Sequence, residues 1–568
     1  MTNYQFTGGT ICAPATIPGT GAISIIRVSG KEALAIADKV IDTKGVPIAE
    51  TEGYRLRYGT VFEADGSVLD NVIVSVFRAP HSYTGENSVE ISCHASRFIV
   101  NKILELLVNA GARIAAPGEF TRRAFVNGKM DLAQAEAVAD VIASQSAASH
   151  RVAMNQLKGG FSSELKVLRE KLLTMTSLLE LELDFSEEDV EFASRKELGQ
   201  LVDDSLTHIR RLTASFSRGN AIKNGVPVAI VGATNTGKST LLNALLGEER
   251  AIVSDIAGTT RDTIEETLNI DGILFRFIDT AGIRETDETI EKIGIDRTFK
   301  KLGEAAVVLG MTDLSRGEAA VLEDADFILS KVNEIGGVKN VAAENDGSET
   351  GGALLAGTDG TALAETGGAS LAETGGTPLD ETGGAHPAET GGASQHGHGD
   401  GQERKVVILV NKCDVAGSFY KDDNGTVYGS GNDLGENMAE ISDNKNVNHD
   451  NNIVSLIENK YDNCKVIPIS AKTGKGLSTL TKTLGEIGSE ITGSTDETLV
   501  TNVRHYEALV RAASALERVR AGLHIATLPP DLIAQDLREA LYNLGEIVGE
   551  ITTDETLGNI FRNFCIGK

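Results

Sequence analysis

The 568-residue sequence has no paired cysteines, no membrane-length apolar segment and no recognisable secretion signal. Its five cysteines are scattered singly, which disfavours zinc sites and disulfide frameworks and favours a reducing compartment. The opening MTNYQFTGGT has neither a basic segment nor an apolar core, and no apolar run is long enough to span a bilayer. These absences predict a cytoplasmic protein without membrane association.

Basic residues are also scarce, with 53 Lys and Arg against 81 Asp and Glu and a net charge of −28. The deficit is local. Residues 341–400 hold ten acidic and no basic residues, and residues 415–463 hold nine acidic and three basic ones, so these two stretches carry −16 of the total. The remaining −12 is unexceptional for a chain of this length, and basic patches for a nucleic-acid partner are therefore not excluded.

The first of these acidic stretches is a repeat. Glu-Thr-Gly-Gly begins at residues 349, 365, 373, 381 and 389, with a decayed copy at 357. A period of eight fits neither a helix nor a strand, and the unit lacks aromatic residues, which favours a solvated, disordered insertion at about 335–403. An Asn- and Asp-rich stretch at about 416–463 is interpreted as a second insertion of the same kind.

The remaining sequence predicts a multidomain protein. Residues 1–125 alternate short strand-like runs with an amphipathic helix, typical of an α+β domain. Helical periodicity fills 126–222 and returns in 493–568, which predicts one all-α helical domain split in two. Between these blocks, residues 223–492 alternate strands and helices, which predicts an inserted α/β P-loop domain with a parallel, doubly wound sheet carrying both low-complexity insertions.

The chemistry is concentrated in the inserted domain. GATNTGKS, residues 232–239, follows a strand and precedes a helix, as a phosphate-binding P-loop requires. Its backbone N–H groups and the following helix N-terminus would hold phosphates. Lys238 would reach the β- and γ-phosphates, and the Ser239 hydroxyl would ligate Mg²⁺.

Three further motifs follow in order. GTTRD (258–262) offers Thr259 and Thr260 as γ-phosphate sensor and second Mg²⁺ hydroxyl, and DTAG (279–282) supplies a carboxylate at a strand end. NKCD (411–414) and SAK (470–472) lie where a base would sit. The Asp414 carboxylate can accept two hydrogen bonds from guanine, whereas adenine presents the wrong pattern, so the motifs predict GTP.

The residue that activates water is less evident from the motifs. Ras-type GTPases place a glutamine directly after DxxG, but Ile283 occupies that position. Glu285, Glu288 and Glu291 follow, and Glu291 begins a new helical run. Spacing alone favours a solvated carboxylate for any one of these three.

With these motifs in place, the chain resembles the MnmE (TrmE) family of tRNA-modification GTPases. The resemblance is carried by TICAPATIPGTGAISIIRVSG, SYTGENSVEISCHAS, APGEFTRRAFVNGKMDLAQAEAVADVI, the GTPase motifs and the terminal FCIGK. It implies an N-terminal domain that binds folate and forms a homodimer. GTP hydrolysis would drive addition of a carboxymethylaminomethyl or aminomethyl group at C5 of the tRNA wobble uridine.

The resemblance also implies cofactors and partners. The one-carbon unit would come from 5-formyl- or 5,10-methylene-tetrahydrofolate, and the flavoprotein MnmG, bringing FAD, would join in an α2β2 complex. Arg27, Glu90, Lys129 and Lys568 match folate-contacting positions. Glu291 matches a water-orienting glutamate, and K⁺ would replace an arginine finger when two GTPase domains pair.

Together, motifs and resemblance give the predicted site. The catalytic set is Glu291, Lys238 and Cys565, and the metal set is Ser239 and Thr260 for Mg²⁺ and Asn235, Ser254, Ile256 and Thr259 for K⁺. The GTP-binding set is Asn235, Thr236, Gly237, Lys238, Ser239, Thr240, Ser254, Asp255, Ile256, Ala257, Gly258, Thr259, Thr260, Asp279, Thr280, Ala281, Gly282, Asn411, Lys412, Asp414, Ser470, Ala471 and Lys472.

Several alternatives stay open. Cys565 lies fourth from the end, but Gly567 and Lys568 make a poor prenylation signal, and the cysteine is either a participant in the modification or simply buried. The chain departs from the family at His94-Ala95-Ser96, where His-Gly-Gly is usual. A GTP-dependent switch in ribosome assembly and a folate-dependent transferase with regulatory GTP are the competing functions. We expect residues 341–400 to be dispensable for GTP hydrolysis.

Overall fold

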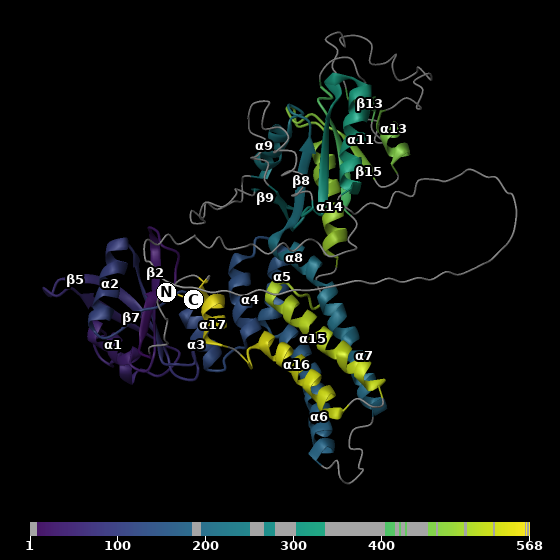
Figure 1. Ribbon diagram of the computed structural model, residues 1–568. Coiled ribbons are helices and arrows are strands. Elements are labelled where there is room, and N and C mark those ends of the chain that lie inside the picture. The colour runs from purple at the N-terminus through teal and green to yellow at the C-terminus, as the bar shows by residue number, and fades with distance from the viewer. Residues whose placement is uncertain are drawn as a thin grey trace, which may run out of the picture.

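The structure is a computed structural model of the chain, and three domains can be traced in it (Figure 1). It describes residues 8–184, 195–249, 266–278, 303–334, 404–414, 420–421, 427–428, 453–461, 464–493, 497–525, 529–551, 553–562, 564 and 567. In this part of the chain, no helix is both long enough and apolar enough to cross a membrane.

The N-terminal domain is a seven-stranded sheet covered on one face by two helices. The strands lie in the order β3 (Ile41–Asp42), β4 (Arg55–Phe62), β5 (Val68–Phe77), β6 (Ser88–Ala95), β2 (Gly21–Ser29), β1 (Ile11–Pro14) and β7 (Arg113–Ile114). The helices α1 (Ala33–Val40) and α2 (Arg97–Asn109) pack on it, and α3 (Glu119–Val126) follows.

The alternation along β5 explains why only one face is covered. Val72, Val74 and Val76 are buried in the core with α1 and α2, whereas Ile73 between them is 48% exposed. Side chains on a strand point alternately to opposite faces, so Ile73 lies on the other face of the sheet from the three valines, between Asn71 and Ser75. On the neighbouring β4, Tyr58 pairs with Ile73 and is 67% exposed. The outer face of this sheet therefore carries exposed apolar side chains among polar ones.

The helical domain is assembled from two segments of the chain that flank the inserted domain. The first segment supplies α4 (Leu132–Ala143), α5 (Ala147–Leu157), α6 (Gly160–Asp184), α7 (Arg195–Ala214) and α8 (Phe216–Asn224), and the second supplies α15 (Val503–Leu523), α16 (Pro530–Val548) and α17 (Asp554–Arg562). Leu172 and Leu206 from the first segment share one core with Leu516 and Leu537 from the second. Figure 1 shows α15 and α16 lying against α6 and α7.

The inserted domain has a six-stranded sheet between two helical layers. Its strand order is β15 (Cys464–Pro468), β12 (Lys405–Asn411), β11 (Val307–Asp313), β8 (Val226–Gly232), β10 (Ile273–Phe277) and β9 (Glu266–Ile270). The helices α9 (Lys238–Glu249) and α14 (Leu477–Thr492) share one core with the sheet, and α11 (Glu318–Glu334) and α13 (Ile453–Lys460) share the other. A short pair, β13 (Tyr420–Lys421) and β14 (Val427–Tyr428), stands apart.

The predicted fold class is confirmed, with two corrections in the inserted domain. Five of its strands are parallel, but the edge strand β9 runs antiparallel to β10, because a two-residue Asp271-Gly272 turn joins them. The expected insertion at 416–463 also extends too far. Ile453, Val454 and Ile457 of α13 are buried in the sheet core, so this amphipathic segment belongs to the domain. The insertion predicted at 335–403 lies outside the described residues.

Candidate functional site

The P-loop connects the end of β8 at Gly232 to the start of α9 at Lys238. Its conformation requires glycine at two points. A Cβ at Gly232 (φ +154°) would overlap the carbonyl oxygen of Met311, and a Cβ at Gly237 (φ +97°) would lie 2.5 Å from Nδ2 of Asn411. Asn235 has φ +63°, a left-handed backbone conformation that residues other than glycine seldom adopt. Such a loop at a helix N-terminus is suited to bind phosphate groups.

The Lys238 side chain lies in this loop. Its Nζ donates to the carbonyl oxygens of Gly232 at 2.8 Å and Ala233 at 2.6 Å, and burial lowers the pKa of the amine. A buried cation held by two carbonyl dipoles has no carboxylate to balance it at these contacts, so an anion is the partner that its chemistry favours. Ser239 and Thr240 are exposed in the first turn of α9 beside it.

Asn411 joins three of the predicted motifs. Its Nδ2 donates to the carbonyl oxygen of Thr236 in the P-loop at 2.6 Å, and its Oδ1 accepts from the backbone N–H of Ala471 at 3.0 Å. The residue is 3% exposed, so neither bond is replaced by water at low cost. The P-loop, the NKCD motif and the SAK motif therefore meet at one edge of the sheet, at the carboxyl ends of β8, β12 and β15.

The two base-recognition motifs lie side by side. Asp414 is half-buried just after β12, and the loop after β15 is closed by a backbone bond from Ser470 to Lys475, with Lys472 exposed within it. The backbone N–H of Cys413 donates to the carbonyl of Ile469, which ties the two loops together. This arrangement brings Asp414 next to Ser470, Ala471 and Lys472.

The structure adds one partner that the motifs did not predict. Lys412, with φ +64°, donates through Nζ to Oδ2 of Asp313 at 2.6 Å. Burial raises the pKa of Asp313, but the bonds from Lys412 and Ser315 outweigh burial and hold its pKa below the usual range. Asp313 is the last residue of β11, the strand next to β12. Its position at the end of a strand-like run was the feature of the sequence that could have identified it.

Twelve residues of the predicted nucleotide site lie outside the described part of the chain. They are Ser254, Asp255, Ile256, Ala257, Gly258, Thr259, Thr260, Asp279, Thr280, Ala281, Gly282 and Glu291.

A second cluster of predicted residues forms in the N-terminal domain. Arg27 on β2 and Glu90 on β6 are register partners, and Nε and Nη2 of Arg27 donate to Oε1 of Glu90 at 2.9 and 2.8 Å. The guanidinium lies 5.1 Å from the ring centre of Tyr83 and 5.6 Å from that of Phe120. The charges of Arg27 and Glu90 thus balance each other, and the guanidinium lies close to two aromatic rings.

The C-terminal end of the chain reaches this cluster. Nη1 of Arg27 donates to the carbonyl oxygen of Gly567 at 3.4 Å. A Cβ at Gly567 (φ +97°) would overlap the carbonyl oxygen of Pro14, so the backbone packs directly on β1. Figure 1 shows α17 beside α3. Cys565 and Lys568, on either side of this contact in sequence, lie outside the described residues.

Apolar packing holds α17 against α4. Leu557 and Phe561 of α17 are buried with Leu132 and Ala135 of α4. Gly118 (φ +65°) accommodates them, because a Cβ there would lie 2.8 Å from the carbonyl oxygen of Phe561. The apolar residues of LGNIFRNF therefore form an interface with α3 and α4.

Lys129 lies in the loop between α3 and α4. Its Nζ donates to the carbonyl oxygen of Pro80 at 3.1 Å.

At the departure from the family pattern, Ala95 pairs with Gly21, and a Cβ at Gly21 would lie 3.8 Å from the Ala95 Cβ, which is ordinary contact. The alanine thus fits at this position without requiring a glycine on the adjacent strand.

A buried ionic network beside the Arg27 cluster was not predicted from the sequence. Glu119, 6% exposed, accepts from Arg123 at 2.9 Å and from Arg113, and Arg123 also donates to Glu86 at 3.0 Å. Burial raises the pKa of Glu119, but the bonds from Arg113, Ala116 and Arg123 hold it below the usual range. The network fixes α3 against the loop before β6, and the charged GEFTRR run was its signal.

The four described cysteines are poor nucleophile candidates. Burial raises the pKa of the thiols of Cys12, Cys93 and Cys413 to about 11 and that of Cys464 to about 12. They stay protonated near neutral pH.

The fold and the loop geometry define a P-loop nucleotide-binding protein whose nucleotide domain is inserted into a helical domain. Comparison with known proteins specifies the family. Residues 10–129 match the family described as GTP-binding protein TrmE N-terminus, and residues 132–565 match the MnmE helical domain. The chain belongs to the MnmE family of tRNA modification GTPases.

Curated relatives agree over nearly the whole length. Proteins named tRNA modification GTPase MnmE from Bacteroides thetaiotaomicron and Parabacteroides distasonis are 43% and 44% identical, each over 98% of this chain and 99% and 100% of their own. That from Porphyromonas gingivalis is 42% identical over 100% of this chain and 99% of its own.

Proposed function

We propose that this protein hydrolyses GTP and uses the hydrolysis in modifying the wobble uridine of tRNA. One observation supports the nucleotide part above all others. Asn411 bridges Thr236 of the P-loop and Ala471 of the SAK loop, so phosphate and base motifs share one site. Family membership supports the tRNA part.

The nucleotide chemistry follows from the residues at this edge of the sheet. Lys238 holds the β- and γ-phosphates, and the exposed hydroxyl of Ser239 would hold Mg²⁺ together with Thr260. Asp414 accepts hydrogen bonds from guanine, with Asn411 and the Ser470-Ala471-Lys472 loop enclosing the base. The loop's open backbone and its buried lysine fit an anionic phosphate chain, which supports this assignment.

Hydrolysis needs a group that orients water, and Ile283 is unable to do so. We assign this role to Glu291. Asn235 is exposed on the P-loop with φ +63° and, with Ser254, Ile256 and Thr259, would hold K⁺, which supplies the positive charge that an arginine finger gives elsewhere. Turnover is then fast only in K⁺ and only when two nucleotide domains pair.

Pairing fits a homodimer formed by the N-terminal domain. The uncovered outer face of its sheet carries Leu56, Tyr58 and Ile73, exposed by 66%, 67% and 48%. An uncovered apolar sheet face of this kind is typical of an interface rather than of a monomer surface.

The modification chemistry is assigned to the Arg27 cluster. A tetrahydrofolate, in the 5-formyl or 5,10-methylene form, would supply the one-carbon unit, with Glu90, Lys129 and Lys568 as polar contacts. Arg27 orients Glu90 and the C-terminal backbone, Tyr83 and Phe120 provide flat apolar surfaces, and Cys565 takes part in the reaction. The flavoprotein MnmG, with FAD, would share the reaction in an α2β2 complex.

A kinetic experiment tests the hydrolysis part. GTP turnover by the purified full chain is measured in K⁺ and in Na⁺ over a range of protein concentrations, for the unaltered chain and for Asn235→Ala. We expect turnover per chain to rise with concentration in K⁺ only, and Asn235→Ala to lose the difference between salts. Equal rates in both salts would overturn the cation assignment.

A further inference from the structure

The β9–β10 hairpin touches the helical domain with its tip. Nδ2 of Asn269 donates to the carbonyl oxygen of Gln145, in the α4–α5 junction, at 3.0 Å. A Cβ at Gly272 would lie 3.7 Å from the Cβ of Ala147. Oδ1 of the same Asn269 accepts from the backbone N–H of Gly272 at 3.1 Å, so one amide closes the turn and binds the neighbouring domain.

The hairpin connects the two nucleotide motifs that respond to the γ-phosphate. In the sequence, GTTRD ends four residues before β9 begins, and DTAG starts two residues after β10 ends. Both strands are therefore separated from these nucleotide motifs by only a few residues of chain. On its other side the hairpin is held by α14, where Gly488 allows close approach of Phe275.

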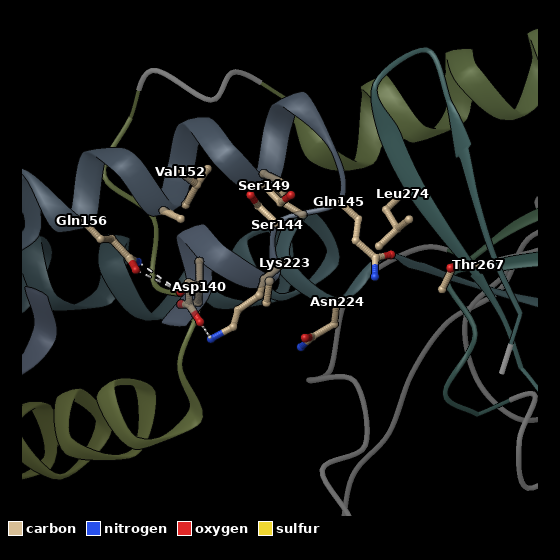
Figure 2. A pocket seen from close by; sticks show the side chains of 14 residues that line it. Asp140, Ser144, Gln145, Ser149, Val152, Gln156, Lys223, Asn224, Thr267 and Leu274 are labelled. Carbon is tan, nitrogen blue, oxygen red and sulfur yellow. Dashed lines mark hydrogen bonds and ion pairs between the residues drawn. The ribbon is translucent and has the colours of Figure 1, made fainter. Parts of the chain in front are cut away.

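The hairpin also contacts α5 and α8 of the helical domain, and a Cβ at Gly225, after α8, would lie 3.3 Å from Leu274. A cavity of about 250 Å³ separates Thr267 and Leu274 of the hairpin from α4, α5 and α8 (Figure 2). The one ion pair drawn across its floor joins Lys223 of α8 to Asp140 of α4 at 2.8 Å. The tip of the hairpin bonds the α4–α5 junction directly, and the cavity beside it leaves room for small shifts.

The helix α4 leads from this junction to the Arg27 cluster. Gln145 follows its last residue by two positions, and Leu132 at its other end packs on Leu557 and Phe561 of α17. Twelve helical residues span about 18 Å. Glu136 in the middle of α4 is ion-paired with Arg504 and His505, which ties α4 to the start of α15.

We propose that the Asn269–Gln145 contact relays the nucleotide state of the inserted domain through α4 to the C-terminal segment beside Arg27. Asn269 is thereby a positioning residue that acts on a site in a different domain. The inference rests on the proposed function, since it requires that GTP binds the inserted domain.

Hydrogen exchange measured by mass spectrometry tests the relay. The full chain is compared with GDP and with a non-hydrolysable GTP analogue, reading peptides from α4 to the start of α5. Asn269→Asp keeps an oxygen for the Gly272 N–H but has no donor for Gln145. Asn333→Asp, on α11 in the other core of the sheet, adds the same charge away from the contact. We expect a GTP-dependent change in these peptides in the unaltered chain and in Asn333→Asp, and its loss in Asn269→Asp at unchanged analogue affinity.

A covalent link separates relay from mere structural support. The 3.7 Å between the Ala147 Cβ and a Cβ at Gly272 suits a disulfide. Adding Ala147→Cys and Gly272→Cys to Asn269→Asp should restore the GTP-dependent change when oxidised and not when reduced. An unchanged response in Asn269→Asp, or no rescue by the disulfide, overturns the relay. Failure of the unaltered chain to bind the analogue overturns the proposed function instead.

Discussion

Asn411 and Thr236 are 175 residues apart in the chain, yet Nδ2 of Asn411 lies 2.6 Å from the carbonyl oxygen of Thr236. This bond fixes the distance between the phosphate-binding loop and the base-binding loops before any ligand arrives. A preorganised site of this kind loses less conformational freedom on binding, which favours affinity.

Removing this bridge should weaken nucleotide binding. In Asn411→Ala the buried Thr236 carbonyl and Ala471 N–H both lose their partner, at a cost of about 1–3 kcal/mol each, which predicts at least about tenfold weaker GTP binding. Titration with a fluorescent GTP analogue measures this, with Asn333→Ala on α11 as control. An affinity equal to that of the unaltered chain would show that the bridge does not shape the site.

Asp414→Asn should change the choice of base. The carboxylate accepts from the N–H groups of guanine, whereas the amide adds a donor that suits the extra carbonyl of xanthine. We expect the ratio of GTP to xanthosine triphosphate affinity to fall by at least about tenfold, in line with the cost of an unpaired polar group in a site built for hydrogen bonding. Competition binding measures the ratio. If it does not move, guanine is recognised by other residues.

Gly567→Ala should displace the C-terminal end from Pro14. The added methyl overlaps the Pro14 carbonyl oxygen, and φ +97° is unfavourable for alanine, so the contact with Arg27 is lost. We expect 5-formyl-tetrahydrofolate to bind at least about tenfold more weakly in calorimetry, for a loss of about 1.4 kcal/mol, with GTP binding unaltered.

Gly558→Ala is the matched control for this change. It lies on α17, shortly before Gly567 in the chain, nothing stands within 4 Å of its added Cβ, and alanine favours the helix. If both variants bind folate equally well, the close packing of Gly567 has no part in the folate site.

Glu136→Gln should destabilise the helical domain in a pH-dependent way. Burial raises the pKa of Glu136, but His505 and Arg504 lower it more, from 4.5 to about 2. The unfolded chain therefore binds this proton more readily, so the stabilisation is complete above pH 4.5 and is lost as the pH falls towards 2. The difference in unfolding free energy between the unaltered chain and Glu136→Gln, from urea titrations, should be constant near neutral pH and shrink below about pH 4.5. A difference independent of pH would exclude the ionised carboxylate as its cause.

The parts of the fold that follow local patterns were predictable. The strand ends that carry GATNTGKS, NKCD and SAK are found where parallel strands place them, because both the glycine-rich loop and the apolar strand before it are local signals. The shared core of Leu172 and Leu516 was also indicated, since two helical blocks with unpaired apolar faces flank the inserted domain.

Other parts depend on partners that are distant in sequence. Nothing local to Glu136 shows that Arg504 and His505 would bury it, and nothing in GEFTRR shows which carboxylate each arginine meets. The antiparallel course of β9 depends on the Asp271-Gly272 turn, a signal present in the sequence but weaker than the parallel pattern around it. The burial of α13 was hidden by the polar composition on its N-terminal side.

The most direct measurement is nucleoside mass spectrometry of tRNA from a strain lacking this gene, complemented with the unaltered chain or with Lys238→Ala. The account predicts that the modified group at C5 of the wobble uridine returns with the unaltered chain and stays absent with Lys238→Ala. Full modification with Lys238→Ala, or no change in wobble uridine on deletion, would contradict it.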